Sequence, residues 1–283
     1  MIGWVFPGQG SQSVGMDRAA DHPVTYERAT ACLGWDVRAA CNDPDALGRT
    51  EVSQPAIFTV SIASALGLRA EGEAPDAVAG HSVGEFAALV VAGAIAFEDA
   101  LGAIDRRARA MARAGHDRAG GMVAVIGLSA QDAAACCQEA AGAVAVASIN
   151  APDQVVLSGD RDALGRAADL ARAAGARRVI ALNVSVAAHS PLMAPATDEL
   201  RSALAGITIA VPSVPFVSSV TGRVESEPES IARSLCDGLT APVRWVDAVR
   251  RLQELGVSTF RELQPGNVLS GLIRRLVPAE TSS

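Results

Sequence analysis

The segment "AVAGHSVGEFAALVVAG" at residues 77 to 93 constrains the fold more than any other part of the chain. Its first four residues predict a buried strand, and the apolar residues from 83 onward follow a helical pattern. The sequence Gly80-x-Ser82-x-Gly84 joins the two. A strand that turns directly into a helix predicts an α/β protein, and 283 residues with 49% hydrophobic content suffice for one large domain with a small insertion.

Ser82 has two interpretations. A serine just before a helix is a usual N-cap, and Glu85 three residues later would complete a capping box. The glycines at 80 and 84 favour a nucleophile elbow instead, because they permit a tight turn that presents the serine Oγ and leaves backbone N–H groups free. In a chain with 26 glycines, this pattern alone does not decide between the two.

The order of elements predicts an inserted unit. Strands are expected at 122–127, 144–149, 153–159 and 177–182, and helices at 130–141 and 161–174. This β-α-β-β-α-β order is that of a ferredoxin-like unit. We expect it to form a small subdomain of residues 121–184 within a large subdomain of residues 1–120 and 185–283. In the large subdomain, strands are expected at 2–6, 77–80, 215–219 and 257–262, and helices at 53–68, 83–93, 97–114, 191–205, 229–238, 245–255 and 267–276.

Charge and composition exclude several classes of function. A net charge of -7 and only 4% aromatic residues argue against nucleic-acid binding. The chain shows neither a signal-peptide pattern nor an uninterrupted run of 18 apolar residues, so we expect a cytoplasmic protein without membrane association. The five cysteines lack the spacing of a zinc site, which predicts no metal and thiols kept reduced in the cytosol.

The basic residues narrow the chemistry further. All 24 are arginine, and the absence of lysine excludes a Schiff base, a Ser-Lys dyad and a P-loop. A nucleophilic Ser82 would therefore take a histidine as its base. His81 is the chain neighbour of Ser82 and is badly placed, while His22 and His116 lie in polar or glycine-rich stretches. His189, directly after the inserted unit, is the best candidate for the base.

Five features occur in order along the chain. They are "FPGQGSQ" at 6–12, "GHSVGE" at 80–85, an arginine 25 residues after Ser82, "NAPDQVVLSG" at 150–159 and "VSVAAHSPLM" at 184–193. Together they resemble the malonyl-CoA:acyl-carrier-protein transacylase family, which includes discrete and integrated acyltransferases of polyketide synthases. The resemblance implies an α/β-hydrolase-like core with a parallel sheet, a ferredoxin-like insertion, and an active site between the two.

The resemblance also implies roles for individual residues. Ser82 would be the nucleophile and His189 its base, and the backbone N–H groups of Gln9 and Val83 would form the oxyanion hole. Arg107 matches the arginine that binds the free carboxylate of the malonyl group.

Further residues are predicted around this centre. Met111 lies one helical turn after Arg107, and with Val186, Ala188 and Asn150 it is expected to bind substrate. Many relatives carry Gln or Asn where a main-chain carbonyl holds the catalytic imidazole, and this chain has Gly238 there. Residues 186–189 match neither the malonyl-type nor the methylmalonyl-type motif of polyketide enzymes, so we expect a preference for malonyl with incomplete exclusion of methylmalonyl.

The predicted reaction moves a malonyl group from malonyl-CoA to the phosphopantetheine thiol of an acyl carrier protein, through a malonyl-serine intermediate. No cofactor is expected, because CoA enters as part of the substrate, and we expect a monomer. Three alternatives stay open: a serine thioesterase or esterase, the transferase subunit of a malonate decarboxylase, and a module that only docks a carrier protein. A buried Arg107 would disfavour the esterase, which gains nothing from a desolvated cation.

Overall fold

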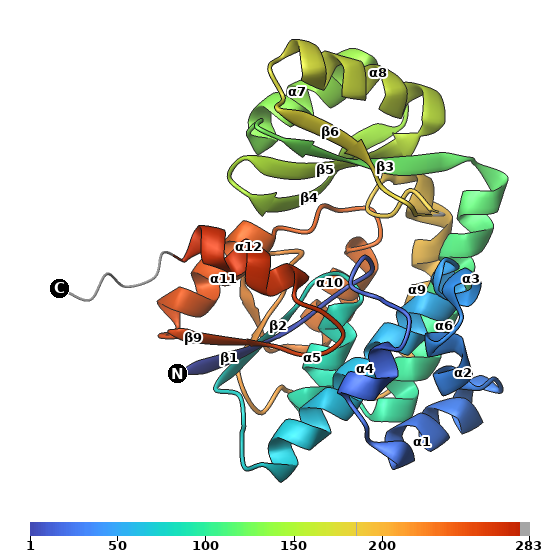
Figure 1. Ribbon diagram of the computed structural model, residues 1–283, viewed down its shortest axis with the longest axis vertical. Coiled ribbons are helices and arrows are strands. Elements are labelled where there is room, and N and C mark those ends of the chain that lie inside the picture. Colours follow the sequence, from blue (N-terminus) through green and yellow to red (C-terminus); the bar gives the residue numbers. More distant parts are fainter. Residues whose placement is uncertain (185, 278–283) are drawn as a thin grey trace.

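The computed structural model describes residues 1–184 and 186–277, and it shows two separate sheets, each accompanied by helices (Figure 1). The larger sheet has the strand order β8-β7-β2-β1-β9, in which only the β7–β8 pair is antiparallel. The predicted α/β class with a parallel sheet is confirmed. The strands of this sheet are β1 (Ile2–Phe6), β2 (Ala77–Gly80), β7 (Phe216–Val217), β8 (Val224–Glu225) and β9 (Thr259–Glu262).

Helices cover both faces of the parallel sheet, which explains why the three inner strands β1, β2 and β7 carry no polar side chains. Trp4 and Phe6 of β1 pack into one hydrophobic core, whereas Val5 points to the opposite face. The described part of the large region contains the helices α1 (Pro23–Leu33), α2 (Val37–Cys41), α3 (Pro44–Leu47), α4 (Thr50–Ala70), α5 (Gly84–Val91), α6 (Phe97–Asp117), α9 (Ala194–Ala205), α10 (Pro228–Asp237), α11 (Trp245–Glu254) and α12 (Val268–Leu276), with short 3-10 turns η1 (Met16–Ala19) and η2 (Pro191–Met193).

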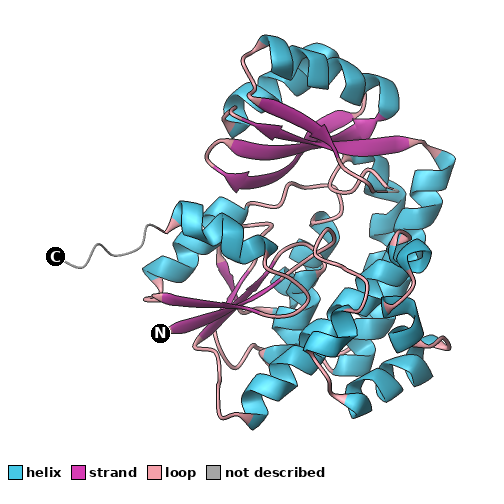
Figure 2. Ribbon diagram, in the orientation of Figure 1, coloured by secondary structure: helices cyan, strands magenta, loops and turns pink. Residues whose placement is uncertain are grey.

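The second sheet is antiparallel and has the order β4-β5-β3-β6. Its two helices lie on one face, at the top of Figure 2, and bury a core of small and branched residues between them and the strands. The elements follow the predicted β-α-β-β-α-β order, with each end within two residues of the expected one. They are β3 (Gly120–Ile126), α7 (Ala130–Ala140), β4 (Val144–Ala151), β5 (Gln154–Asp160), α8 (Arg161–Ala173) and β6 (Arg178–Ala181).

The segment before α11 connects the two regions. The Val243 N–H donates to the carbonyl of Ala147 over 2.9 Å, and the Ile149 N–H donates to the carbonyl of Val243 over 2.8 Å. This isolated bridge fixes the segment along β4, and Figure 1 shows α11 and α12 beside that strand. The open face of the antiparallel sheet is thereby held over the large region.

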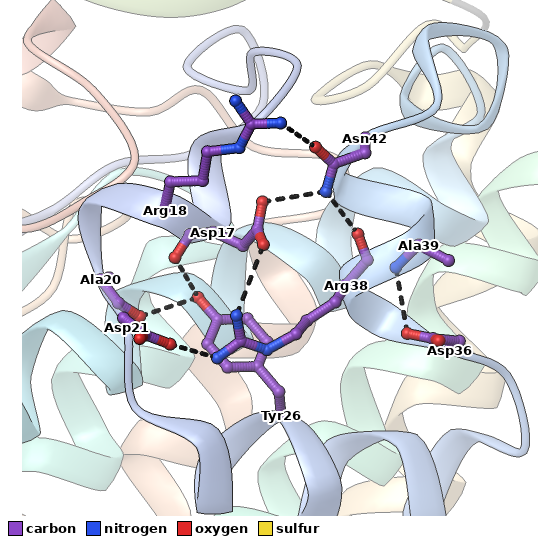
Figure 3. Close-up of polar contacts among 9 residues, drawn as sticks. All are labelled: Asp17, Arg18, Ala20, Asp21, Tyr26, Asp36, Arg38, Ala39 and Asn42. Carbon is purple, nitrogen blue, oxygen red and sulfur yellow. Dashed lines mark hydrogen bonds and ion pairs between the residues drawn. The ribbon is translucent and has the colours of Figure 1, made fainter.

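The segment between β1 and α4 is held by a cluster of polar contacts among residues 17–42 (Figure 3). The buried Asp17 accepts a hydrogen bond from Asn42 over 3.2 Å and lies 3.7 Å from the guanidinium of Arg38. That guanidinium also covers the Tyr26 ring, 4.2 Å from its centroid. The N–H of Gly15 donates over 2.9 Å to the last carbonyl of α2. These contacts fix the far end of the loop that follows β1.

Within the described ranges, no helix combines the length and the apolar character that crossing a membrane requires. The predicted subdomain boundary at 184/185 adjoins residue 185, which lies outside the described residues, so the boundaries stay predictions.

Candidate active site

Ser82 lies on a sharp turn between β2 and α5. Its φ of 56° is in the left-handed region, which a residue with a Cβ rarely adopts. A Cβ at Gly80 would overlap the backbone of Gly84, and a Cβ at Gly84 would overlap the carbonyl of Phe6. Both glycines are therefore required by close backbone approach, as a nucleophile elbow demands.

The capping box does not form. The N-cap of α5 is Val83, and no side chain caps this helix. Glu85 is buried and accepts hydrogen bonds from the Ser219 N–H over 2.7 Å and from the hydroxyl groups of Ser218 and Ser219 over 3.0 and 3.2 Å. Burial raises the pKa of Glu85 to about 7, although these hydrogen bonds oppose the shift. Glu85 thus ties the elbow helix to the end of β7 instead of capping it.

The side chains of Ser82 and His189 meet across the site, although 107 residues separate them. The Oγ of Ser82 lies 2.8 Å from Nε2 of His189, and Nδ1 of His189 lies 3.2 Å from the carbonyl oxygen of Ala241. A carbonyl oxygen only accepts, so Nδ1 carries the ring proton and Nε2 is free to accept from the serine hydroxyl. His189 itself has a φ of 58°, a second left-handed residue in the site.

The orienting carbonyl belongs to Ala241, three residues after the predicted Gly238. The Gly238 carbonyl also favours the charged imidazole, as does that of Ala241, but burial and the positive charge of Arg107 outweigh both and lower the pKa of His189 to about 3. The imidazole is therefore neutral at pH 7, which is the form that accepts a proton. The bridge between Val243 and Ser148 holds the Ala241 loop in place.

Arg107 reaches Ser82 from the buried face of α6. Its side chain is 4% exposed, its Nη2 donates to the Ser82 Oγ over 3.2 Å, and its Nη1 donates to the Oε1 of Gln54. Burial lowers the pKa of Arg107 to about 10, and the negative charge of Glu85 opposes this shift. The guanidinium therefore stays positive at pH 7. Arg109, on the same helix, is instead exposed and forms an ion pair with Asp105.

Ser82 opens into a cavity of about 420 Å³ between the two regions. Strands β3, β4 and β5 contribute to its wall, and α12 contributes from the opposite side. Met111 is buried against Gln54, and neither it nor Arg107 is among the residues that line the cavity, so the predicted role of Met111 in substrate binding stays a prediction. The predicted residues that do line the cavity are Gln9, Ser82, Asn150, Val186, Ala188 and His189.

Two backbone N–H groups beside Ser82 are available to a ligand. Gln9 lies in the loop after β1, and Val83 directly follows Ser82 at the start of α5. Within the described residues, neither N–H donates a hydrogen bond. The Gln9 side chain is fixed by a 3.0 Å hydrogen bond to the Ser53 hydroxyl. Free donors beside a nucleophile suit the oxyanion of an acyl-transfer intermediate.

A serine nucleophile, a neutral histidine within hydrogen-bonding distance of it and two free N–H donors are the groups that nucleophilic acyl transfer requires. Residues 3–280 match the model of the acyl transferase domain family. The chain belongs to this family. It is 41% identical over 290 residues to the malonyl CoA-acyl carrier protein transacylase of Escherichia coli strain K12, covering 99% of this chain and 94% of that protein.

Solved structures agree with this assignment. The malonyl CoA-acyl carrier protein transacylase of Coxiella burnetii superposes with a TM-score of 0.92 at 38% identity, over 97% of this acyl transferase and 90% of that chain. A malonyl-transacylase solved in complex with a type II polyketide acyl-carrier protein superposes with a TM-score of 0.92 at 39% identity, over 98% and 93% of the two chains.

Two further polar residues of the site, His81 and Gln54, have no predicted role in the sequence analysis. His81 was rejected as the base, and its ring does face away from the serine, with Nε2 3.1 Å from Asn150 Oδ1 and 3.4 Å from Ser148 Oγ. Burial lowers the pKa of His81. Gln54 was missed, and its only signal is a single amide at the start of the apolar run of residues 53–68.

Proposed function

We propose that this acyl transferase moves a malonyl group from malonyl-CoA to the phosphopantetheine thiol of an acyl carrier protein. One observation carries the choice of acyl group: a buried guanidinium, that of Arg107, lies 3.2 Å from the Ser82 Oγ. A desolvated cation at the nucleophile is costly unless an anion binds to it, and the free carboxylate of a malonyl group is such an anion. The names of the Escherichia coli and Coxiella burnetii relatives support the same substrates.

In the first half-reaction, Nε2 of His189 accepts the Ser82 proton and Oγ attacks the thioester carbonyl. The N–H groups of Gln9 and Val83 hold the oxyanion of the tetrahedral intermediate. When the carbon–sulfur bond breaks, the CoA sulfur takes the proton from His189 and leaves as the thiol. A malonyl ester on Ser82 remains, with its carboxylate paired to Arg107.

The second half-reaction reverses these roles. The carrier thiol gives its proton to His189, the sulfur attacks the malonyl ester, and the Ser82 oxygen leaves and recovers the proton. The proposal involves neither a metal nor a redox cofactor, because every step is a proton or acyl transfer between groups already named. CoA and the carrier protein are the two acyl partners.

The relatives favour this reaction over the alternatives. A thioesterase for neutral acyl groups would not use the buried Arg107, and a docking module would not need the Ser82–His189 pair. A malonate decarboxylase subunit would use the same residues with a different carrier. The malonyl-transacylase solved with its acyl-carrier protein favours the acyl carrier protein as partner.

We extend the proposal to the finer fold description and to location. The strand order β6-β3-β5-β4 with both helices on one face supports a ferredoxin-like small subdomain of residues 121–184. The serine elbow at the carboxyl end of β2 supports an α/β-hydrolase-like large subdomain. All five cysteines are free thiols, which supports the cytoplasm as the location.

The test is covalent labelling with malonyl-CoA that carries a radioactive malonyl group. The wild-type protein should form a stable adduct that peptide mapping places on Ser82, and Ser82→Ala should form none while keeping its fold. Ser202→Ala, which removes an exposed hydroxyl on α9, is the matched control and should label normally. Wild-type labelling in Ser82→Ala would refute the role of this serine.

A further inference from the structure

Gln54 is a fully buried amide on α4 that lies between the Gln9 loop and the Arg107 side chain. Its Oε1 accepts a hydrogen bond from Nη1 of Arg107. Its Nε2 contacts Thr50 Oγ1 at 2.7 Å, Gln9 Oε1 at 3.1 Å and Met111 Sδ at 3.4 Å. A single side chain therefore connects the loop of Gln9 to the guanidinium beside Ser82.

The orientation of this amide is determined by its neighbours. The Thr50 hydroxyl donates to Gln9 Oε1 over 3.0 Å, so it can only accept from Gln54. An amide rotated by half a turn would place its NH₂ group against the Arg107 donors and its oxygen among acceptors, leaving buried groups unpaired. The oxygen of Gln54 is consequently fixed toward Arg107.

The neutrality of this partner matters for binding. A carboxylate at the same place would form an ion pair with Arg107. The guanidinium would then bind a substrate carboxylate more weakly. Glu85, the acidic residue whose charge acts on Arg107, is itself held by three hydrogen bonds from Ser218 and Ser219. The Arg107 guanidinium is thus hydrogen-bonded to an amide and a hydroxyl, and none of the described carboxylates forms an ion pair with it, so its N–H groups can bind a substrate carboxylate.

We propose that Gln54 is the positioning residue that sets the choice of acyl group, because it holds the Arg107 guanidinium beside Ser82 without neutralising it. This inference rests on the proposed malonyl transfer. Gln54 acts through Arg107. Because it also contacts Gln9, it fixes the position of the Arg107 guanidinium relative to the loop that contains the Gln9 N–H group. Loss of the Gln54–Arg107 contact should therefore slow the transfer of acyl groups that carry a carboxylate much more than the transfer of neutral ones.

Two variants test it, with malonyl-CoA and acetyl-CoA as competing acyl donors. Gln54→Glu places a carboxylate against Arg107, and kcat/KM for malonyl-CoA should fall by about 10- to 100-fold, while that for acetyl-CoA changes less than about threefold. Gln54→Met keeps the length of the side chain and removes the acceptor, and the malonyl:acetyl ratio should fall by about tenfold. Gln138→Glu adds the same charge on the exposed face of α7 and should leave the ratio unchanged.

The outcomes separate this inference from the proposed function. Absence of a malonyl adduct on Ser82 in the wild-type protein would refute both. A normal wild-type adduct with an unchanged malonyl:acetyl ratio in the variants, or an equal loss for both donors, would refute the role of Gln54 alone. An equal loss is what a purely structural role predicts. If Gln54→Glu does not fold, Gln54→Met decides the question by the same ratio.

Discussion

Replacement of Ser82 by glycine should stabilise the fold relative to replacement by alanine. Both variants lose the hydroxyl and its contacts with His189 and Arg107, so they differ only in the Cβ. At the Ser82 φ of 56°, a Cβ costs about 1–2 kcal/mol. Glycine also has more conformational freedom than alanine in the unfolded chain, and this lowers the free energy of unfolding of the glycine variant by about 0.5–1 kcal/mol. Ser82→Gly should therefore exceed Ser82→Ala in free energy of unfolding by roughly 0.75 kcal/mol, the difference between the midpoints of these two ranges.

Equilibrium unfolding in urea measures this difference, and neither variant should form a malonyl adduct. Ala141 offers a control away from the site, because it is exposed and combines a φ of 52° with a ψ of 160°, a conformation that is essentially confined to glycine. Ala141→Gly should therefore raise the free energy of unfolding and keep full activity. Ala135 is exposed and lies in the middle of α7, where glycine disfavours the helix. Ala135→Gly should therefore lower the free energy of unfolding by about 1 kcal/mol. If Ala141→Gly gains stability and Ser82→Gly does not exceed Ser82→Ala, the strain assigned to the elbow is wrong.

Three further predictions concern specificity and pH. Arg107→Ala should lower kcat/KM for malonyl-CoA by at least about tenfold and relatively favour acetyl-CoA, because a charge-assisted contact to a carboxylate contributes about 1.5–3 kcal/mol; an unchanged malonyl:acetyl ratio would show that another group binds the carboxylate. With a His189 pKa of about 3, the base stays neutral as the pH falls through 6.5, so His189 should produce no acid limb in kcat/KM there, and a limb due to Glu85, whose pKa is about 7, should disappear in Glu85→Gln; the malonyl:acetyl ratio should fall above pH 10 as Arg107 loses its proton. A limb near 6.5 that persists in Glu85→Gln would contradict the depressed pKa of His189. Malonyl-CoA should exceed methylmalonyl-CoA by about 10- to 200-fold in kcat/KM, and Ala188→Phe, which fills part of the cavity wall, should widen that margin if the ring fits. Methylmalonyl-CoA as the better donor in a competition assay would refute the predicted selectivity.

The sequence carries the parts of the site that depend on residue type. Close backbone approach requires glycine at 80 and 84, and nucleophilic attack and carboxylate binding require a serine and an arginine. These residue types can be recognised directly in the sequence. Ala241 contributes only a backbone carbonyl, which every residue possesses, so no sequence pattern distinguishes it. This explains why the orienting residue was predicted three positions away, at Gly238.

Local pattern also explains where the fold was predictable. The β-α-β-β-α-β unit alternates clear strand and helix periods, and its elements were placed within two residues. Helices α2 and α3 have only 5 and 4 residues, too short to be stable by propensity alone. They are held by contacts between distant residues, among them the Asp17–Arg38 ion pair in Figure 3, which no window of sequence contains.

The costs of folding are concentrated around Ser82. Two residues, Ser82 and His189, adopt left-handed backbone conformations, and Arg107 and Glu85 are ionisable groups with almost no exposure. Burial disfavours the charged form of His189, Arg107 and Glu85, as the directions of their pKa shifts show. These unfavourable terms persist because the flanking elements are packed on all sides: β2 is buried throughout its length, and so is α5 up to its last turn. Relief of the backbone strain at Ser82 should therefore raise the stability of this acyl transferase and remove its activity together, which is the behaviour expected of a site organised for the transition state rather than for the fold.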